Sequence, residues 1–541
     1  MSNDLNHSGP FADEEGLNEK NVPSITEELV SRIPKPLLIL FYIGAFVTVF
    51  AAGMQAVVPA SFFVYAAQKW GVDVSSLWLL ASYLIGYVSF GLPANRISEH
   101  AGRLATFWFG MVVFVVFTGV IGHSSTSYTF AVLRAFQGIG AAIVTSMAVG
   151  VVGSHTSDRS RSLAVGGLCA AQLLGFGAAH AIGGKLAVDG HFRWGIYMAA
   201  PLMAAPAILC TPALIFDKRP VRDESLLQSV VRYDYVGTLL LFGAAIMTTM
   251  GLTYGGNEYA WSSAMTLCLL VFGCVCIALF LAWEGFGPSS RPILNSRWLL
   301  ERNLQISIWA TILFSMVFVS TAIYVPLMYI TARNQPTDLA GRRNAPFWGM
   351  TVAAALLSGV AIRVRPSLAR PLVWAGLVVG IIFMGLFYTI PLVEDLSKER
   401  GFYAMAGLGI GLAYPAINYI AQASVPLDEA GSAAVISHFL SIVGGMFGLI
   451  LYEACLKSRL IYNMTPVFNS NPLLSTFNIA GMDIAALEAS GPTLLDYVPS
   501  MTEKVGQKLI DSLHTTFVLS VPFLGAVLIA TLFYKQQSIR S

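Results

Sequence analysis

The stretch SYTFAVLRAFQGIGAAIVTSMAVGVVG, residues 127–153, decides the fold class, because it is apolar over a membrane-spanning length and carries one full charge, Arg134. A span needs roughly 20 apolar residues, and a charge at membrane depth is costly unless it meets a partner or a wet cavity. Gln137, Gly138 and Gly140 follow closely, and such small residues let a neighbouring helix approach. The stretch predicts a transporter helix in which Arg134 is functional.

The composition extends this interpretation to the whole chain. Of the 541 residues, 55% are hydrophobic and 11% are charged, whereas soluble domains carry about 25% charged residues. A globular cytosolic enzyme is therefore excluded, and the net charge of +2 argues against a nucleic-acid partner. The six cysteines have neither disulfide-framework nor metal-ligand spacing. We expect no metal, no cofactor and no enzymatic activity.

Apolar runs of spanning length predict an all-α polytopic membrane protein with about 14 transmembrane helices. The runs are 37–60, 76–94, 105–122, 127–152, 162–186, 194–216, 234–254, 262–284, 305–330, 346–362, 371–391, 402–424, 431–455 and 514–534.

The runs divide into two six-helix halves with two extra helices between them in the sequence. The predicted plan is a disordered cytosolic tail (1–35), an N-terminal half (36–216), a cytosolic loop (217–232), the two extra helices (233–285), a C-terminal half (286–534) with a long external loop (457–513), and a cytosolic tail (535–541). Lys and Arg are enriched in the loops on the side of both termini, which predicts that both termini are cytosolic.

An internal repeat supports the two halves. GLPANRISEHAGRLATFWFG after the second span is echoed by GVAIRVRPSLARPLVWAG after the tenth, so that Gly91 matches Gly359 and Arg103 matches Arg370. The QGIGAA segment is echoed by GLGIGLA, which pairs Gly140 with Gly411. Chance matches in glycine-rich spans are the alternative explanation.

These residues resemble the major facilitator superfamily. LRAFQGIGAA (133–142) is similar to its fourth-helix motif, in which an Arg and a Gln–Gly pair line the translocation path. YDYVGTLLLF (233–242), GLTYGGNEYAWSSA (251–264) and FRWGIYMAAP (192–201) resemble the fourteen-span drug:proton antiporters, fungal members in particular. The resemblance implies proton-driven export of a small organic molecule, such as a drug, toxin or metabolite, by alternating access.

The chain also departs from that family in three places. In the gating loop, formed by Gly91, Asn95, Arg96, Gly102 and Arg103, the family has Asp where this chain has Asn95. Ala179-His180 stands in place of a Gly-Pro pair in the fifth span, and the first span lacks an acidic residue. These departures keep open an alternative function, a proton-independent facilitator or an importer, for example of iron chelates or amino acids.

Polar residues at mid-span positions are the candidates for the functional site. The transport path is predicted from Arg134, Gln137, Gly138, Gly140, Gln55, Gln172, Tyr324, Tyr414 and Asn418, although each polar side chain could instead form a helix–helix hydrogen bond. The candidates for proton handling are His180, His438 and Glu453, with Asp234 and Glu284 at span ends. The expected partners are a small-molecule substrate, protons and the lipid bilayer, for a monomer in the plasma membrane rather than the vacuolar membrane.

Overall fold

The computed structural model describes residues 33–62, 76–124, 126–217, 234–255, 259–286, 301–333, 335–390, 396–469 and 502–535. Within these ranges the regular structure is helical and no strand is formed, which confirms the predicted all-α class. Residues 1–32, 218–233 and 536–541 lie outside the described residues, and with them nearly all of the predicted tails and cytosolic loop.

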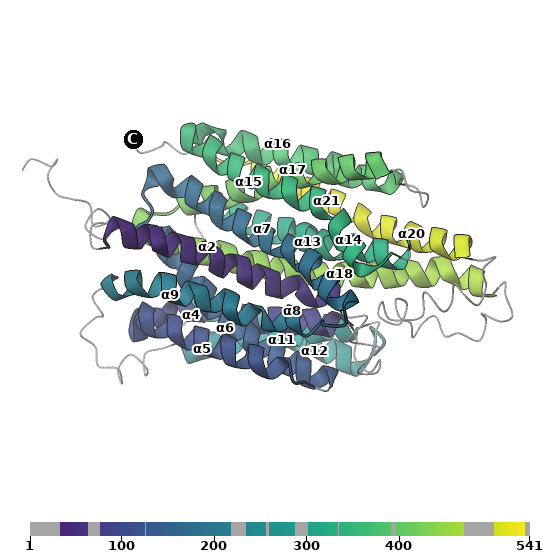
Figure 1. The fold of residues 1–541 in the computed structure, drawn as a ribbon, viewed down its shortest axis with the longest axis horizontal. Helices are drawn as coiled ribbons and strands as arrows, with labels where there is room; N and C mark the ends of the chain where they lie inside the picture. Colours follow the sequence, from purple (N-terminus) through teal and green to yellow (C-terminus); the bar gives the residue numbers. More distant parts are fainter. Residues whose placement is uncertain are drawn as a thin grey trace, which may run out of the picture.

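The helices form two groups and a linking pair, arranged as one bundle with near-parallel axes (Figure 1). The first group is α2 (Lys35–Val57), η1 (Val58–Ser61), α4 (Ser76–Ala101), α5 (Arg103–Ile121), α6 (Ser127–His155), α7 (Asp158–Val188), α8 (Trp194–Tyr197) and α9 (Ala199–Phe216). The linking pair is α11 (Tyr235–Tyr254) and α12 (Ala264–Phe286). The second group is α13 (Arg302–Thr331), α14 (Thr337–Arg343), α15 (Ala345–Val364), η3 (Pro366–Leu368), α16 (Ala369–Leu386), η4 (Phe387–Thr389), α17 (Leu396–Ala423), η5 (Leu427–Glu429), α18 (Ala430–Asn469), α20 (Thr502–Val518) and α21 (Ser520–Leu532).

Every predicted apolar run is helical. In the described part of the chain, 13 stretches are long and apolar enough to cross a membrane. Helix α4, with 26 residues, occupies the remaining predicted run and packs between α6, α11 and α18. The predicted complement of spans, two sets of six with two more between them, therefore agrees with the structure.

Two predicted boundaries differ from the structure. Helix α18 continues to Asn469 and α20 begins at Thr502, so the loop predicted over 457–513 is helical at both ends. The gating segment is also more helical than expected, because α4 continues through Asn95 and Arg96 to Ala101. The turn is confined to Gly102, whose φ of 84° is a conformation that glycine adopts without strain.

Glycines set the packing of the helices that match in the repeat. A Cβ at Gly138 would meet the backbone of Tyr83 on α4, and a Cβ at Gly140 would meet the backbone of Phe114 on α5. In the second group, Gly407 packs in the same way on α15 and Gly409 on α16. The equivalent of Gly140 is therefore Gly409. The sequence pairing of Gly140 with Gly411 is wrong, because Gly411 faces α15 rather than α16.

The linking pair lies at the side of the bundle. Helix α11 packs on α4 and α18, and α12 packs on α11. Asp234 caps α11 by accepting from the Gly237 N–H at 2.8 Å and from Trp283 Nε1 at 2.9 Å. Asp234 therefore ties the start of α11 to the end of α12.

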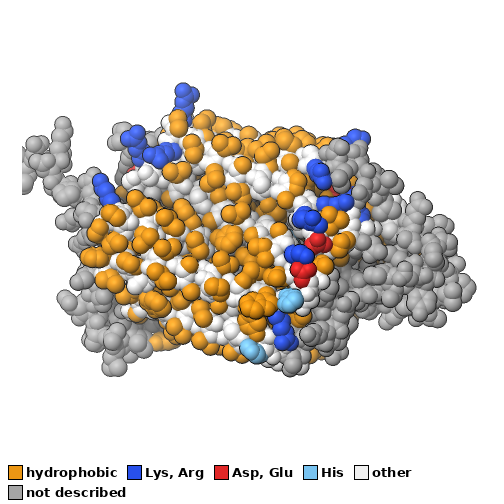
Figure 2. Space-filling view, viewed as in Figure 1, with side chains coloured by type: hydrophobic (Ala, Val, Ile, Leu, Met, Phe, Trp, Pro, Cys, Tyr) orange, Lys and Arg blue, Asp and Glu red, His pale blue; other side chains and the backbone are white. Residues whose placement is uncertain are grey.

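The outer surface suits a lipid environment. Hydrophobic side chains cover the middle of the bundle, whereas Lys, Arg, Asp and Glu lie toward its ends (Figure 2). Ile208 on α9 is 75% exposed and Leu239 on α11 is 71% exposed. A contiguous apolar belt of this kind marks a membrane-facing surface rather than a water-facing one.

Candidate functional site

Arg134 lies in the first third of α6, and its side chain is completely buried. Its Nη1 donates to Gln137 Oε1 at 2.7 Å and to Gln55 Oε1 at 3.3 Å, and its Nη2 donates to the Gln55 carbonyl at 2.5 Å. The Tyr83 ring centre is 4.6 Å from the guanidinium carbon, and Gln137 in turn donates to Thr118 Oγ1 at 2.8 Å. Arg134 therefore joins α2, α4 and α5 to α6.

The charge of Arg134 is held by neutral groups. Among the described residues no carboxylate pairs with it, and its Nε has no hydrogen-bond partner. Burying a cation without a counter-ion is more costly than burying an apolar side chain of similar size. The presence of an arginine at this buried position favours a functional role over a purely structural one.

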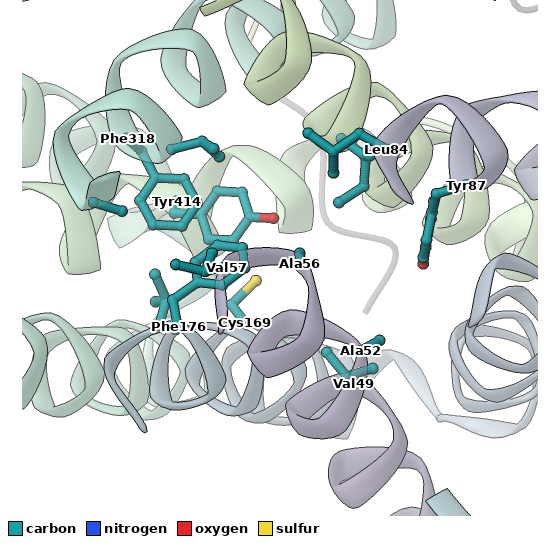
Figure 3. Packing of buried hydrophobic residues seen from close by; sticks show 14 of the residues in the cluster. Val49, Ala52, Ala56, Val57, Leu84, Tyr87, Cys169, Phe176, Phe318 and Tyr414 are labelled. Carbon is teal, nitrogen blue, oxygen red and sulfur yellow. The ribbon is translucent and has the colours of Figure 1, made fainter. Parts of the chain in front are cut away.

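A cavity lies between the first and second groups. Its volume is about 30 Å³, which holds roughly two water molecules. Figure 3 shows Cys169 of α7 close to Tyr414 of α17, with Val49 farther along α2, and all three line the cavity. The lining residues are Val49, Val149, Val165, Leu168, Cys169 and Gln172 from the first group and Tyr414, Asn418, Gln422, Ala434 and His438 from the second.

Two hydrogen bonds join the groups beside this cavity. The Tyr414 hydroxyl donates to Gln172 Oε1 at 2.9 Å and also lies 2.9 Å from Ser441 Oγ. The Tyr87 hydroxyl of α4 lies 2.9 Å from His438 Nε2 of α18. Because each bond connects helices of different groups, both must lengthen or break when the groups separate.

The structure divides the predicted path residues into separate sets. Gln172, Tyr414 and Asn418 line the cavity together with His438. Gln55, Arg134 and Gln137 form one buried cluster inside the first group and are not among the lining residues. The others pack helices within a single group: Gly138 and Gly140 in the first, and Tyr324, whose hydroxyl donates to the Leu449 carbonyl at 3.1 Å, in the second.

The proton-handling candidates lie in different places, and all are buried except His438, which is half-buried. Only His438 lines the cavity. His180 on α7 is buried where Gly341 of α14 packs on its backbone. Glu453 is buried on α18, and Asp234 and Glu284 belong to the linking pair. Of these groups, His438 is the one that a molecule in the cavity would meet.

A buried charged cluster closes one end of the first group, which we call the Arg103 end. Arg103 Nη1 donates to Asp217 Oδ2 at 2.6 Å, and His155 Nε2 lies 3.4 Å from Asp217 Oδ1. Arg103 Nη2 also donates to Ser154 Oγ at 3.3 Å. The cluster joins the start of α5 to the ends of α6 and α9.

The environment of Asp217 shifts its titration. Burial alone would raise the pKa of the Asp217 carboxyl, but the hydrogen bond from His155 and the charge of Arg103 outweigh burial and hold its pKa below the usual range. The lowered pKa means that the ionised carboxylate stabilises the folded protein. This stabilisation is present above the unfolded pKa of about 3.9 and is lost as the pH falls through the lower folded pKa.

Replacing Asp217 with Asn is therefore expected to lower the melting temperature in detergent at pH 7. Removing one partner of a buried pair costs about 3–5 kcal/mol. The deficit relative to the wild type should shrink when both proteins are melted below about pH 4. Asp189→Asn is the control, because it breaks an exposed pair with Lys185, worth about 0–1 kcal/mol. Equal melting temperatures for Asp217→Asn and the wild type at pH 7 would contradict the assignment.

The predicted gating residues all belong to the first group, and two of them, Gly91 and Asn95, face the second group at this end. Asn95 Nδ2 donates to Ser432 Oγ of the second group at 3.5 Å, which is a weak contact. A Cβ at Gly91 would lie 3.0 Å from the Phe439 ring of α18. Arg103 pairs with the Asp217 carboxylate.

The opposite end of the second group has its own buried ion pair. Arg333 Nη1 donates to Glu399 Oε2 at 2.6 Å, and both side chains are almost fully buried. The Tyr329 ring lies 5.4 Å from the Arg333 guanidinium. We call this the Arg333 end.

Sequence reasoning missed several of these residues. Tyr83, Tyr87 and Thr118 stand in apolar runs, where nothing distinguishes them from packing residues. Asp217 directly precedes the basic run KRPVR, and that neighbourhood conceals its pairing with Arg103. One sequence signal pointed to the Arg333 end. The loop that contains Arg333 is positively charged although it lies on the side opposite to the loops enriched in Lys and Arg.

Comparison with known proteins points to one family of membrane proteins. A sequence profile of the Major Facilitator Superfamily matches residues 41–449. The MFS-type transporter thnB of Trichoderma harzianum is 25% identical over 84% of this chain and 77% of its own length. The MFS efflux transporter aclA of Aspergillus oryzae is 24% identical over 83% and 80%, and the multidrug transporter protein MdtP of Bacillus subtilis is 22% identical over 85% and 86%.

A solved structure supports the fold. The bacterial homologue of the human lysosomal transporter Spinster, in an inward-facing and occupied conformation, superposes with a TM-score of 0.58 at 12% identity. The match covers 92% of this chain and 97% of that one. The helical arrangement is therefore shared at a sequence identity that shows the fold alone.

Proposed function

Because this chain belongs to the major facilitator superfamily, we propose that it is a secondary active exporter of small amphiphilic organic molecules, driven by protons in antiport. The two groups of helices would rock against each other around the cavity and expose it to one side of the membrane at a time. Both termini would be cytosolic, and the protein would act as a monomer in the plasma membrane.

The observation that carries this proposal is the cavity lined by both groups. Its walls are largely apolar, from residues such as Val49, Leu168 and Ala434, with amides and a phenol at Gln172 and Tyr414. Mostly apolar walls with a few placed polar groups suit a small organic ligand. The names of the efflux and multidrug relatives support export as the direction.

The close approach of the groups at both ends supports alternating access. At the Arg103 end, a Cβ at Gly153 would lie 2.8 Å from Gly431 Cα, and at the Arg333 end a Cβ at Gly184 would lie 2.7 Å from the Thr337 carbonyl. A cavity of about 30 Å³ is too small for an organic substrate. Loading therefore requires the groups to part at one end.

His438 is the group that we propose for proton coupling. Imidazole is the side chain whose unperturbed pKa lies nearest physiological pH. His438 lines the cavity, and its Nε2 lies 2.9 Å from the Tyr87 hydroxyl across the interface. Protonation would convert both ring nitrogens to donors. Tyr87 would then have to accept rather than donate, and the bond between the groups would change with the protonation state.

The test is efflux from vesicles that contain the purified protein, with and without an imposed pH gradient, using a broad panel of organic compounds. We expect flux that follows the gradient. Flux that runs down the substrate gradient alone, indifferent to pH, would support the facilitator alternative instead. Import against the substrate gradient would overturn the proposed direction.

His438→Gln is expected to remove the stimulation by the pH gradient while leaving downhill flux measurable. Glutamine keeps a hydrogen-bonding side chain but cannot take up or release a proton, so that only the coupling to protons is lost. Tyr87→Phe is the matched control, because it removes the same bond to His438 without removing the titratable group. A His438→Gln protein that still responds fully to the gradient would assign coupling to another residue.

A further inference from the structure

Arg161, in the first turn of α7, is a second buried arginine, and its hydrogen-bonding capacity is largely unused. Its side chain is 4% exposed. Its Nε and Nη2 have no hydrogen-bond partner among the described residues. Asp158 Oδ1 lies 2.9 Å from Nη2, but the contact lacks hydrogen-bond geometry, and the Asp158 side chain is 66% exposed. A guanidinium presents five N–H donors, and leaving buried donors unpaired is costly.

The position of Arg161 relates it to the cavity. On α7, residues 161, 165, 168 and 172 fall at spacings of four, three and four, which places them on one helix face. Val165, Leu168 and Gln172 on that face line the cavity. Tyr419 of α17 interacts electrostatically with Arg161, and it stands one turn before the cavity residue Gln422. Arg161 is not itself among the lining residues, but it stands one helical turn beyond Val165 on the same face, toward the Arg103 end.

We propose that Arg161 is an anion-binding point for the exported molecule, so that the preferred substrates are amphiphiles that carry a carboxylate. This inference rests on the proposed export function and adds the chemical class of its substrate. The planar guanidinium matches the two oxygens of a carboxylate, and such charge-assisted bonds are about twice as strong as neutral ones. The apolar body would lie along Val165 and Leu168, and the amides of Asn418 and Gln422 would meet intermediate polar groups.

Matched ligand pairs test this directly. We would measure equilibrium binding of the full chain, in phosphatidylcholine vesicles, to radiolabelled octanoate and 1-naphthaleneacetate and to their primary amides. Each pair differs only in the charged group. We expect the wild type to bind at least one acid about tenfold more tightly than its amide, which is the usual scale for a hydrogen bond to a charged group.

Variants then assign the preference to Arg161. Arg161→Gln should reduce the acid-over-amide ratio about tenfold, to near one, and leave amide binding unchanged, whereas Arg161→Lys should retain part of the ratio. The matched control is Arg159→Gln, which removes the same charge from an exposed position two residues away. A melting temperature near that of the wild type for Arg161→Gln would show that the variant is folded.

Several outcomes would overturn the inference. They are an acid no better bound than its amide in the wild type, a preference that survives Arg161→Gln, or an equal loss in Arg159→Gln. Loss of the preference when phosphatidylglycerol is added to the vesicles would instead assign Arg161 to a lipid headgroup. Efflux of the amides without any preference for acids would refute the inference while leaving the proposed function intact, whereas efflux of neither class with intact acid binding would refute export.

Discussion

Arg134→Ala is expected to abolish transport and to lower the melting temperature of the purified protein at the same time. The change removes three hydrogen bonds, two to the side-chain oxygens of Gln137 and Gln55 and one to the Gln55 carbonyl. Each buried acceptor left unpaired costs about 1–3 kcal/mol. Relief of the uncompensated charge offsets part of this loss, so we expect a net destabilisation of a few kcal/mol.

The pair of measurements separates two roles for Arg134. Transport and melting temperature that fall together indicate that Arg134 acts by joining α2, α4 and α5 to α6. A variant that melts like the wild type but does not transport would indicate that Arg134 meets the substrate in another conformation. Normal transport would refute a functional role altogether. Arg134→Lys is the control, because it keeps the charge but loses the planar fork of donors.

Hydropathy predicted the number and positions of the helices because each apolar span is specified by its own residues. The helix ends were harder to predict, because they depend on tertiary contacts. Helix α18 extends beyond its apolar run to Asn469, where it packs on α20, and Asn463 Nδ2 donates to Ser512 Oγ at 2.9 Å. Both residues of that contact fall inside the loop predicted over 457–513, and hydropathy carries no information about such a contact.

The sequence predicted which residues are candidates for the functional site, but not which of them contact one another. Gln55 and Gln172 appeared equivalent as polar residues in apolar spans, yet Gln55 accepts from Arg134 while Gln172 accepts from Tyr414 beside the cavity. Which partner an amide meets depends on how helices pack, over sequence separations of 79 and 242 residues. The buried Arg161 was missed for the same reason, because its sequence neighbours Asp158 and Arg159 suggest an ordinary solvated helix start.

Gly431→Val is expected to hold the groups apart at the Arg103 end and so to stop transport. A Cβ at Gly431 would lie 2.6 Å from the Gly150 carbonyl oxygen and 3.1 Å from Ser154 Cβ, both on α6. Overpacking of this kind costs about 1–3 kcal/mol. The cost applies only while α6 and α18 are in contact, so the equilibrium shifts about 5–150-fold toward the open arrangement.

Cys169 provides a native reporter of this opening, because it lines the cavity and is buried. In a variant that keeps Cys169 as its single cysteine, Gly431→Val should raise the rate of labelling by a membrane-impermeant maleimide about tenfold or more, from the side of the Arg103 end only. Gly349→Val is the matched control, since a Cβ there meets nothing within 4 Å. Because the substitution acts only on the contact between α6 and α18, unchanged labelling would mean that this contact does not close the cavity. Faster labelling together with undiminished transport would mean that closure at this end is not part of the transport cycle.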